Sequence, residues 1–160
     1  MSVHKPEPTT VATACRIAIV ASRFNQHIVE RLVEGAVNVL QAMGQGVDAP
    51  QVVWVPGAFE LPLAAQWLAL TKKWDAVVCL GCVIRGGTNH YDYVCSEAAR
   101  GIMQASLTHN LPVLFGVLTC NNEQQALDRA GGQLGNKGAD VMQAALEMVQ
   151  LRQQLHTSNE

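Results

Sequence analysis

Along the chain, two kinds of apolar pattern alternate regularly. Short apolar runs rich in β-branched residues are each followed by a longer stretch with apolar residues at helical spacing. The short runs predict buried parallel strands, and the longer stretches predict helices that cover a sheet. Strands are expected at Arg16–Ala21, Gln51–Val55, Asp75–Ile84 and Pro112–Thr119, and helices at Asn25–Met43, Phe59–Thr71, His90–Asn110 and Val141–Leu155, with a short helix from Asn121 to about Ala130. This order predicts the α/β class, with a four-stranded parallel sheet inside a three-layer αβα sandwich.

Residues 15–155 are expected to form a single domain, because no linker or internal repeat divides them. Residues 1–14 contain two prolines and little pattern, and are expected to be a flexible N-terminal tail. The pattern Asn121-x-x-Gln124 predicts a capping box that opens the short helix. Four closely spaced glycines then predict a flexible joint before the last helix: Gly131, Gly132, Gly135 and Gly138.

Composition excludes several classes of protein. Hydrophobic residues make up 49% and charged residues 15% of the 160 residues, which is too apolar for a disordered chain. The net charge is -2 without a basic block, so nucleic-acid binding has no electrostatic support. No apolar stretch is long enough for a membrane span, and Met1–Thr13 does not resemble a signal peptide. A cytoplasmic location is therefore expected.

The chain has five cysteines, an odd number that argues against a disulfide framework. Cys79 and Cys82 form a C-x-x-C motif, which raises the alternative of a metal or redox site. Both residues lie inside an expected strand, where an offset of three places side chains on opposite faces. No second cysteine or histidine pair completes a zinc site, so no metal is expected.

Ligands of such sheets bind at the carboxyl ends of the strands, so four loops are candidates for the site. They are Ser22–Gln26, Pro56–Glu60, Arg85–His90 and Thr119–Asn122. In the first loop, Phe24 is either a platform for stacking a flat ring or a hydrophobic staple at the helix start. In the second loop, the spacing alone favours Glu60 as a residue that stabilises the start of a helix.

The third loop is the most informative. Gly86-Gly87-Thr88 follows a buried strand and precedes a helix, where backbone N–H groups and the helix N-terminus attract an anion. The motif is neither G-x-G-x-x-G nor a Walker A loop, so it predicts a site for one small phosphate. His90 follows, and the residues leave open whether it is structural or catalytic. Arg129 and Lys137 could pair with a phosphate or belong to solvated helix faces.

From about Arg16 to Leu151, the chain resembles the lumazine synthase family. The matching blocks are Ser22–Asn25, Val55–Pro62, Val83–Val94, Phe115–Thr119, Arg129–Gly131 and Gly135–Gly138. The resemblance implies a flavodoxin-like fold and the penultimate step of riboflavin biosynthesis. In that step, 5-amino-6-(D-ribitylamino)uracil condenses with 3,4-dihydroxy-2-butanone 4-phosphate to give 6,7-dimethyl-8-ribityllumazine, phosphate and water. The family uses no cofactor and no metal.

The resemblance also implies a role for individual residues. Phe24 would stack on the pyrimidine ring, and the rest of that subsite would be Ala58, Phe59, Glu60, Cys82, Val83, Ile84 and Phe115. The phosphorylated ketone would be bound by Gly87, Thr88 and Arg129, with Lys137 as a candidate for a further phosphate contact. His90 would transfer protons. Three departures from the family pattern matter: Cys82 replaces a common Thr or Ala, Gln133 replaces a common Lys, and Thr119–Asn122 is atypical after its strand.

Family members form pentamers with sites shared between subunits, and some build hollow capsids. Phe115, Arg129 and His90 are expected to fall in different halves of such a shared site. Capsid members add their N-terminal segment as a strand to a neighbour, which Pro6 and Pro8 disfavour because each lacks a backbone donor. A pentamer or a pair of pentamers is therefore expected.

Two alternatives use the same scaffold. A flavin or lumazine carrier would need the stacking and ribityl contacts but no proton relay, so His90 and Arg129 argue against it. A structural shell protein would not need Gly87, Thr88 and Arg129 together.

Overall fold

The structure is a computed structural model that describes residues 15–44 and 48–157, and the predicted N-terminal tail lies outside these residues. The strands are β1 (Ile17–Ser22), β2 (Gln51–Val55), β3 (Ala76–Ile84), β4 (Val113–Cys120), β5 (Ala130–Gly132) and β6 (Gly135–Asn136). The α-helices are α1 (Gln26–Ala42), α2 (Leu61–Leu70), α3 (His90–His109), α4 (Glu123–Arg129) and α5 (Lys137–Thr157). A short 3₁₀ turn, η1 (Ala58–Glu60), precedes α2.

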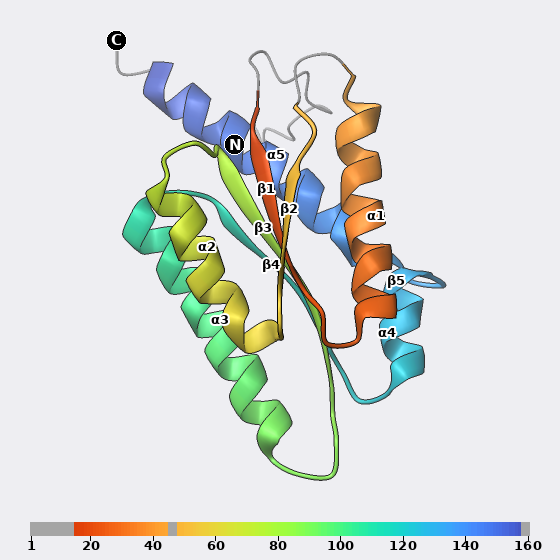
Figure 1. Cartoon of the computed structure of the whole chain (residues 1–160). Coiled ribbons are helices and arrows are strands. Elements are labelled where there is room, and N and C mark those ends of the chain that lie inside the picture. The colour runs from red at the N-terminus through yellow and green to blue at the C-terminus, as the bar shows by residue number, and fades with distance from the viewer. Residues whose placement is uncertain (1–14, 45–47, 158–160) are drawn as a thin grey trace, which may run out of the picture.

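The four long strands form one parallel sheet in the order β2-β1-β3-β4. Figure 1 shows α2 and α3 together on one face of this sheet, and α1 and α5 on the other. The predicted three-layer αβα sandwich and flavodoxin-like parallel sheet are therefore confirmed. In this arrangement the loops that follow the strands gather at one end of the molecule.

Two apolar clusters fill the spaces between the layers, one on each face of the sheet. Alternate side chains of β3 enter different clusters: Cys79 packs on the α2 and α3 side, and Cys82 on the α1 and α5 side. This confirms the prediction that the C-x-x-C motif divides between the two faces. The prediction that every strand is buried on both faces is wrong for β2 and β4, because these are the edge strands.

The predicted glycine joint is instead an ordered antiparallel ribbon of β5 and β6. Gly131 and Gly135 have φ of 98° and 78°, values that a residue with a Cβ adopts with strain. After the ribbon, Asn136 accepts a hydrogen bond from Ala139 N through Oδ1 (3.1 Å) and donates through Nδ2 to Arg31 O of α1 (2.9 Å). This cap starts α5 at Lys137, four residues earlier than the apolar pattern indicates.

The predicted capping box of the short helix forms one residue later than expected. Gln125 N donates to Asn122 Oδ1 (2.9 Å), and Asn121 N donates to Gln125 Oε1 (2.9 Å). The side chain of Gln124 instead donates to Asp128. The pairs Asn121-Asn122 and Gln124-Gln125 allow the same motif in two registers that differ by one residue. The sequence pattern indicates the register that the structure does not adopt.

Candidate active site

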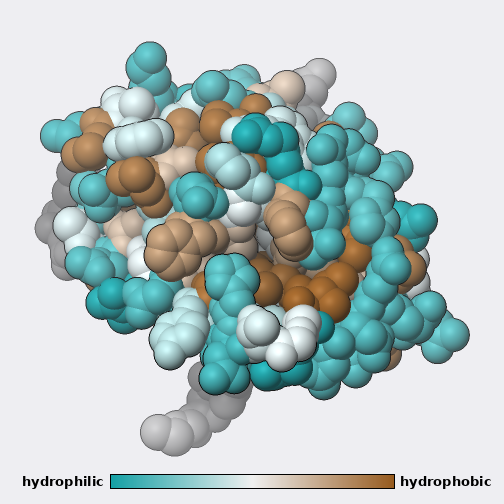
Figure 2. All heavy atoms as spheres, turned by 60° about the horizontal axis from the view of Figure 1, so that its bottom comes forward, coloured by the Kyte–Doolittle hydropathy of each residue, from teal (hydrophilic) through white to brown (hydrophobic). Residues whose placement is uncertain are grey.

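One cavity opens at the carboxyl ends of the strands, with a volume of about 490 Å³. Figure 2 looks onto this end of the molecule and shows hydrophobic atoms in a recess between hydrophilic groups. The lining comes from the loops after β1, β2 and β3 and from the first turns of α3, which is the expected place for a ligand. The lining residues are Phe24, Gly57, Ala58, Phe59, Glu60, Cys82, Val83, Ile84, Gly86, Thr88, His90, Tyr91, Tyr93 and Val94.

The ring of Phe24 lines this cavity and is 71% exposed. Its backbone is fixed, because Arg23 N donates to Val55 O (2.8 Å) and Phe24 N donates to Pro56 O (3.1 Å). A hydrophobic staple would bury the ring against its own helix, so this exposure argues against that alternative. The arrangement leaves a flat aromatic surface available to a ligand or a second chain.

Asn25 holds the Phe24 loop in place, and the sequence reasoning gave it no role of its own. It adopts the left-handed conformation (φ 57°, ψ 43°) at the start of α1, which Asn tolerates better than most residues. Its side-chain Nδ2 donates to Cys82 O at the end of β3 (3.0 Å). This bond ties the Phe24 loop to the end of β3, which also lines the cavity. The sequence signal that could have indicated this role is an Asn at the start of a predicted helix.

Glu60 stabilises a turn, as its spacing predicts, and its side chain also lies at the cavity. Its Oε2 accepts a hydrogen bond from Gly57 N (2.9 Å), which stabilises the turn before α2. The same side chain lines the cavity beside Ala58 and Phe59. One carboxylate oxygen is thus engaged by the turn, and Oε1 is available for a ligand hydroxyl.

Cys82, Val83 and Ile84 form the end of β3 and line the cavity together. Burial raises the pKa of the Cys82 thiol to about 12, so the side chain is a neutral thiol at physiological pH. A buried, protonated thiol is neither a good nucleophile nor a metal ligand. Cys82 therefore contributes a small side chain and its backbone to the site.

The glycine loop connects β3 to α3, and Gly86 and Thr88 face the cavity. Gly87 lies between them but is not among the lining residues. A Cβ added to Gly86 or Gly87 would meet no atom within 4 Å, and neither residue has a positive φ. The contacts and backbone angles of a single chain thus give no steric reason for glycine at these two positions. His90 follows in the first turn of α3 and lines the same cavity.

Besides Gly87, three predicted site residues are not among the residues that line this cavity: Phe115, Arg129 and Lys137. Phe115 pairs with Cys79 midway along the sheet and is 42% exposed on the edge strand β4. Arg129 donates from Nη1 to Gln125 O of its own helix (2.9 Å), and Lys137 pairs with Asp140 (2.8 Å). Among the described residues that line the cavity, none is Lys or Arg. A phosphate bound in one chain would therefore lack a strong cationic partner.

The fourth candidate loop does not take part in the cavity. Asn121 and Asn122 are used to cap α4, and no residue of Thr119–Asn122 is among the lining residues. β4 is an edge strand, and its loop leads to α4, which lies on the same side of the sheet as α1 (Figure 1).

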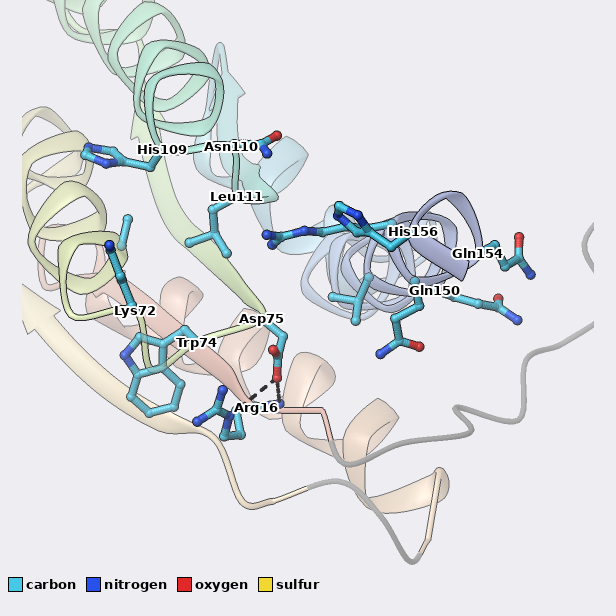
Figure 3. Close-up of a pocket in the computed structure, with 14 residues that line it drawn as sticks. Arg16, Lys72, Trp74, Asp75, His109, Asn110, Leu111, Gln150, Gln154 and His156 are labelled. Carbon is cyan, nitrogen blue, oxygen red and sulfur yellow. Dashed lines mark hydrogen bonds and ion pairs between the residues drawn. The ribbon is translucent and has the colours of Figure 1, made fainter. Parts of the chain in front are cut away.

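A larger cavity, of about 850 Å³, lies at the opposite end of the sheet, where the strands begin. Figure 3 shows the Arg16 and Asp75 pair here, with Lys72 on one side and His156 on the other. Arg16 N donates to Asp75 Oδ2 (2.7 Å), and the two side chains form an ion pair. The carboxyl ends of α2, α3 and α5 meet at this end of the sheet. Cations there stabilise the partial negative charge of these helix ends. The charged groups of this cavity thus have a structural explanation, even though its volume exceeds that of the cavity at the carboxyl ends of the strands.

Metal sites, disulfides and membrane-spanning helices are all absent from the described residues. They contain no group of three His, Cys, Asp or Glu side chains that could hold a metal ion. All five cysteines are free thiols. No helix among them is long and apolar enough to cross a membrane.

The fold and the cavity define a flavodoxin-like α/β protein with a small-molecule site at the carboxyl ends of its strands. The family model described as 6,7-dimethyl-8-ribityllumazine synthase matches residues 14–153. A curated relative, the 6,7-dimethyl-8-ribityllumazine synthase of Desulfovibrio desulfuricans, is 50% identical over 144 residues, which are 90% of this chain and 92% of the relative. The chain therefore belongs to the 6,7-dimethyl-8-ribityllumazine synthase family, which confirms the resemblance in the sequence.

Proposed function

We propose that the cavity at the carboxyl ends of the strands holds both substrates of the family's condensation. The chain is a transferase of riboflavin biosynthesis: it joins 5-amino-6-(D-ribitylamino)uracil to 3,4-dihydroxy-2-butanone 4-phosphate and releases 6,7-dimethyl-8-ribityllumazine, phosphate and water. One observation carries the proposal for the site. An exposed aromatic ring, a carboxylate, a glycine loop and a histidine, from three separate segments, converge on a single cavity.

The pyrimidine occupies the side of the cavity formed by the first two loops. Phe24 stacks on its ring, because it is the most exposed of the large aromatic side chains that line the cavity and its backbone is fixed by hydrogen bonds to the β2 end. The end of β3 offers backbone groups to the ring edge. Glu60 Oε1 accepts a hydrogen bond from the ribityl chain, while Oε2 remains bonded to Gly57 N. Ala58 and Phe59 complete this side.

The phosphorylated ketone occupies the side formed by the glycine loop. The N–H groups around Gly87 and the N-terminus of α3 attract its phosphate, and the Thr88 hydroxyl donates a hydrogen bond. The open space around both glycines supports this allocation. Departure of phosphate needs its growing charge stabilised, which Arg129 does by a bidentate contact. Lys137 is a weaker candidate for the same task, because Asp140 already neutralises it.

His90 moves protons between the two substrates. The primary amine of the pyrimidine attacks the ketone carbonyl, and the carbinolamine that forms loses water to give an imine. Two protons therefore leave nitrogen and reach the departing oxygen. His90 lines the cavity that holds both proposed subsites and can carry these protons. Holding two small molecules in a reactive geometry supplies much of the remaining acceleration.

The site is completed by a second copy of the chain. Phe115 and Arg129 lie outside the cavity of their own chain, and an exposed phenylalanine on an edge strand favours contact with a neighbour. Exposed apolar residues on α2 and α3, such as Leu63, Trp67 and Leu107, supply further contact surface. We propose a homopentamer, or a pair of pentamers, with each site between two neighbours. The five free thiols support a cytoplasmic location.

Replacing His90 by Ala is expected to lower kcat by roughly tenfold and to leave both KM values nearly unchanged. Proton relay is one contribution beside substrate positioning, and water can replace part of it. The measurement is kcat against pH in the neutral range, where the variant should lose the dependence that the native protein shows. His156→Ala, an exposed histidine at the far end of α5, is the matched control. An unchanged rate at every pH would remove His90 from the mechanism.

Mixing two inactive variants tests the shared site. Phe24→Ala and Arg129→Ala change opposite halves of the proposed site, so dissociated and reassembled mixtures should regain activity. In randomly mixed oligomers, about a quarter of the sites pair two native halves. Each variant reassembled alone is the control. A mixture that stays as inactive as its parents would show that both residues act within one chain.

A further inference from the structure

The structure contains a clamp across the glycine loop that involves residues outside the proposed substrate contacts. Arg85 is the last residue before the glycines, and its backbone N donates to Cys120 O of β4 (2.9 Å). Its guanidinium carbon lies 4.2 Å from the centroid of the Tyr91 ring, and its Nη2 lies 3.2 Å from Asp92 Oδ1. The side chain thus returns over the loop to the first turn of α3.

We propose that Arg85 is a positioning residue that closes this loop and orients its N–H groups toward the phosphate. The proposal rests on the allocation of the phosphorylated ketone to Gly87 and Thr88. Arg85 does not line the cavity, and neither does Asp92. Tyr91 does, so the clamp reaches the substrate through the loop and through one wall of the cavity.

The loop needs such a clamp because glycines lose more conformational freedom on ordering than other residues. Within residues 15–44 and 48–157, no recorded hydrogen bond joins Gly86 or Gly87 to the rest of the chain. The nearest internal contact is long, from His90 N to Thr88 Oγ1 (3.4 Å). The two side-chain contacts of Arg85 thus join the start of the loop directly to the first turn of α3 at its other end.

The chemistry of the clamp fits arginine in particular. A planar guanidinium can stack on an aromatic face and still direct N–H groups at a carboxylate, whereas a lysine ammonium offers no planar surface. Arg85 and Asp92 are about half exposed, so each contact is modest and is weakened by salt. The clamp is thus suited to adjusting loop geometry rather than to stabilising the whole fold.

Direct phosphate binding by Arg85 is the competing explanation, and Asp92 separates the two. If Arg85 positions the loop, Asp92→Asn loosens the clamp and weakens binding of the phosphorylated ketone. If Arg85 binds phosphate itself, Asp92→Asn releases the guanidinium from its partner and strengthens that binding. The two explanations therefore predict opposite changes from one substitution.

The test compares Arg85→Gln, Arg85→Lys and Asp92→Asn with the native oligomer. Each variant is expected to raise KM for the phosphorylated ketone by about three- to tenfold, the size typical of losing exposed contacts of these kinds. KM for the pyrimidine should not change. Arg85→Lys should recover only part of the loss. The matched control is Arg100→Gln, which breaks an exposed pair with Glu97 farther along the same helix.

Hydrogen exchange at Gly86, Gly87 and Thr88 gives a readout independent of turnover. Faster exchange in Arg85→Gln and Asp92→Asn, but not in Arg100→Gln, is expected even if the native protein proved inactive with these substrates. The clamp is disproved if exchange and KM both stay at native values in an active Arg85→Gln protein. A lower KM for the phosphorylated ketone in Asp92→Asn would also overturn it, in favour of direct binding.

Discussion

Replacing Arg129 by Ala is expected to lower kcat/KM for the phosphorylated ketone by about 100-fold, the loss typical of removing one group that stabilises developing charge. The cavity itself is lined by no Lys or Arg among the described residues, so little else compensates. Gln133, between β5 and β6, is uncharged and adds nothing to the positive charge that Arg129 supplies. KM for the pyrimidine should remain near its native value.

Steady-state kinetics with each substrate varied in turn measure this effect. Arg129→Lys keeps the charge but loses the bidentate geometry, so it should retain an intermediate rate. Arg152→Ala, on the exposed part of α5, is the control for a general loss of positive charge. An equal loss with both substrates would instead indicate that Arg129 supports the structure of α4, where it donates to Gln125 O.

The second large effect is expected on stability, from Gly138→Ala. Gly138 lies in the first turn of α5, and an added Cβ would overlap the backbone carbonyl group of Leu32 in α1. Neither atom belongs to a flexible side chain, so one helix must shift and the apolar contacts between α1 and α5 must loosen. Overpacking of this kind destabilises by about 3 kcal/mol. Urea unfolding at fixed protein concentration measures the change.

Gly86→Ala is the matched control for this stability measurement, because an added Cβ there meets no atom within 4 Å. It should unfold at the native urea concentration or slightly above it. The same variant should bind the phosphorylated ketone less well, since the methyl group would occupy the proposed approach of the phosphate. Equal stability of Gly138→Ala and the native protein would show that α1 and α5 do not pack as closely as the structure indicates.

The sequence predicted the fold because alternating strand and helix patterns restrict an α/β chain to few arrangements. The prediction was wrong where the local structure depends on contacts between residues that are far apart in the sequence. The β5 and β6 ribbon and the early start of α5 depend on Asn136, whose side chain binds Arg31 O of α1. Glycine spacing alone indicates conformational freedom of the backbone. It gives no information about a hydrogen-bond partner that lies 105 residues away in the sequence.

Part of the candidate site could be predicted from the sequence, because the alternating pattern locates the loops that follow the strands. Residues in the loops after β1, β2 and β3 converge on one cavity, as strand-end positions in a parallel sheet should. Asn25 was missed because its importance lies in a backbone conformation and a bond to Cys82 O. Phe115, Arg129 and Lys137 were matched to the family, but their place outside the cavity depends on the three-dimensional structure.

The most direct test of the account is to mix the purified chain with both substrates and follow the absorbance and fluorescence of the lumazine. We expect 6,7-dimethyl-8-ribityllumazine and one equivalent of phosphate to appear together, without an added metal or cofactor. A flavin or lumazine carrier would bind the product without forming it. A correctly folded oligomer that forms no lumazine from the two substrates would contradict the account.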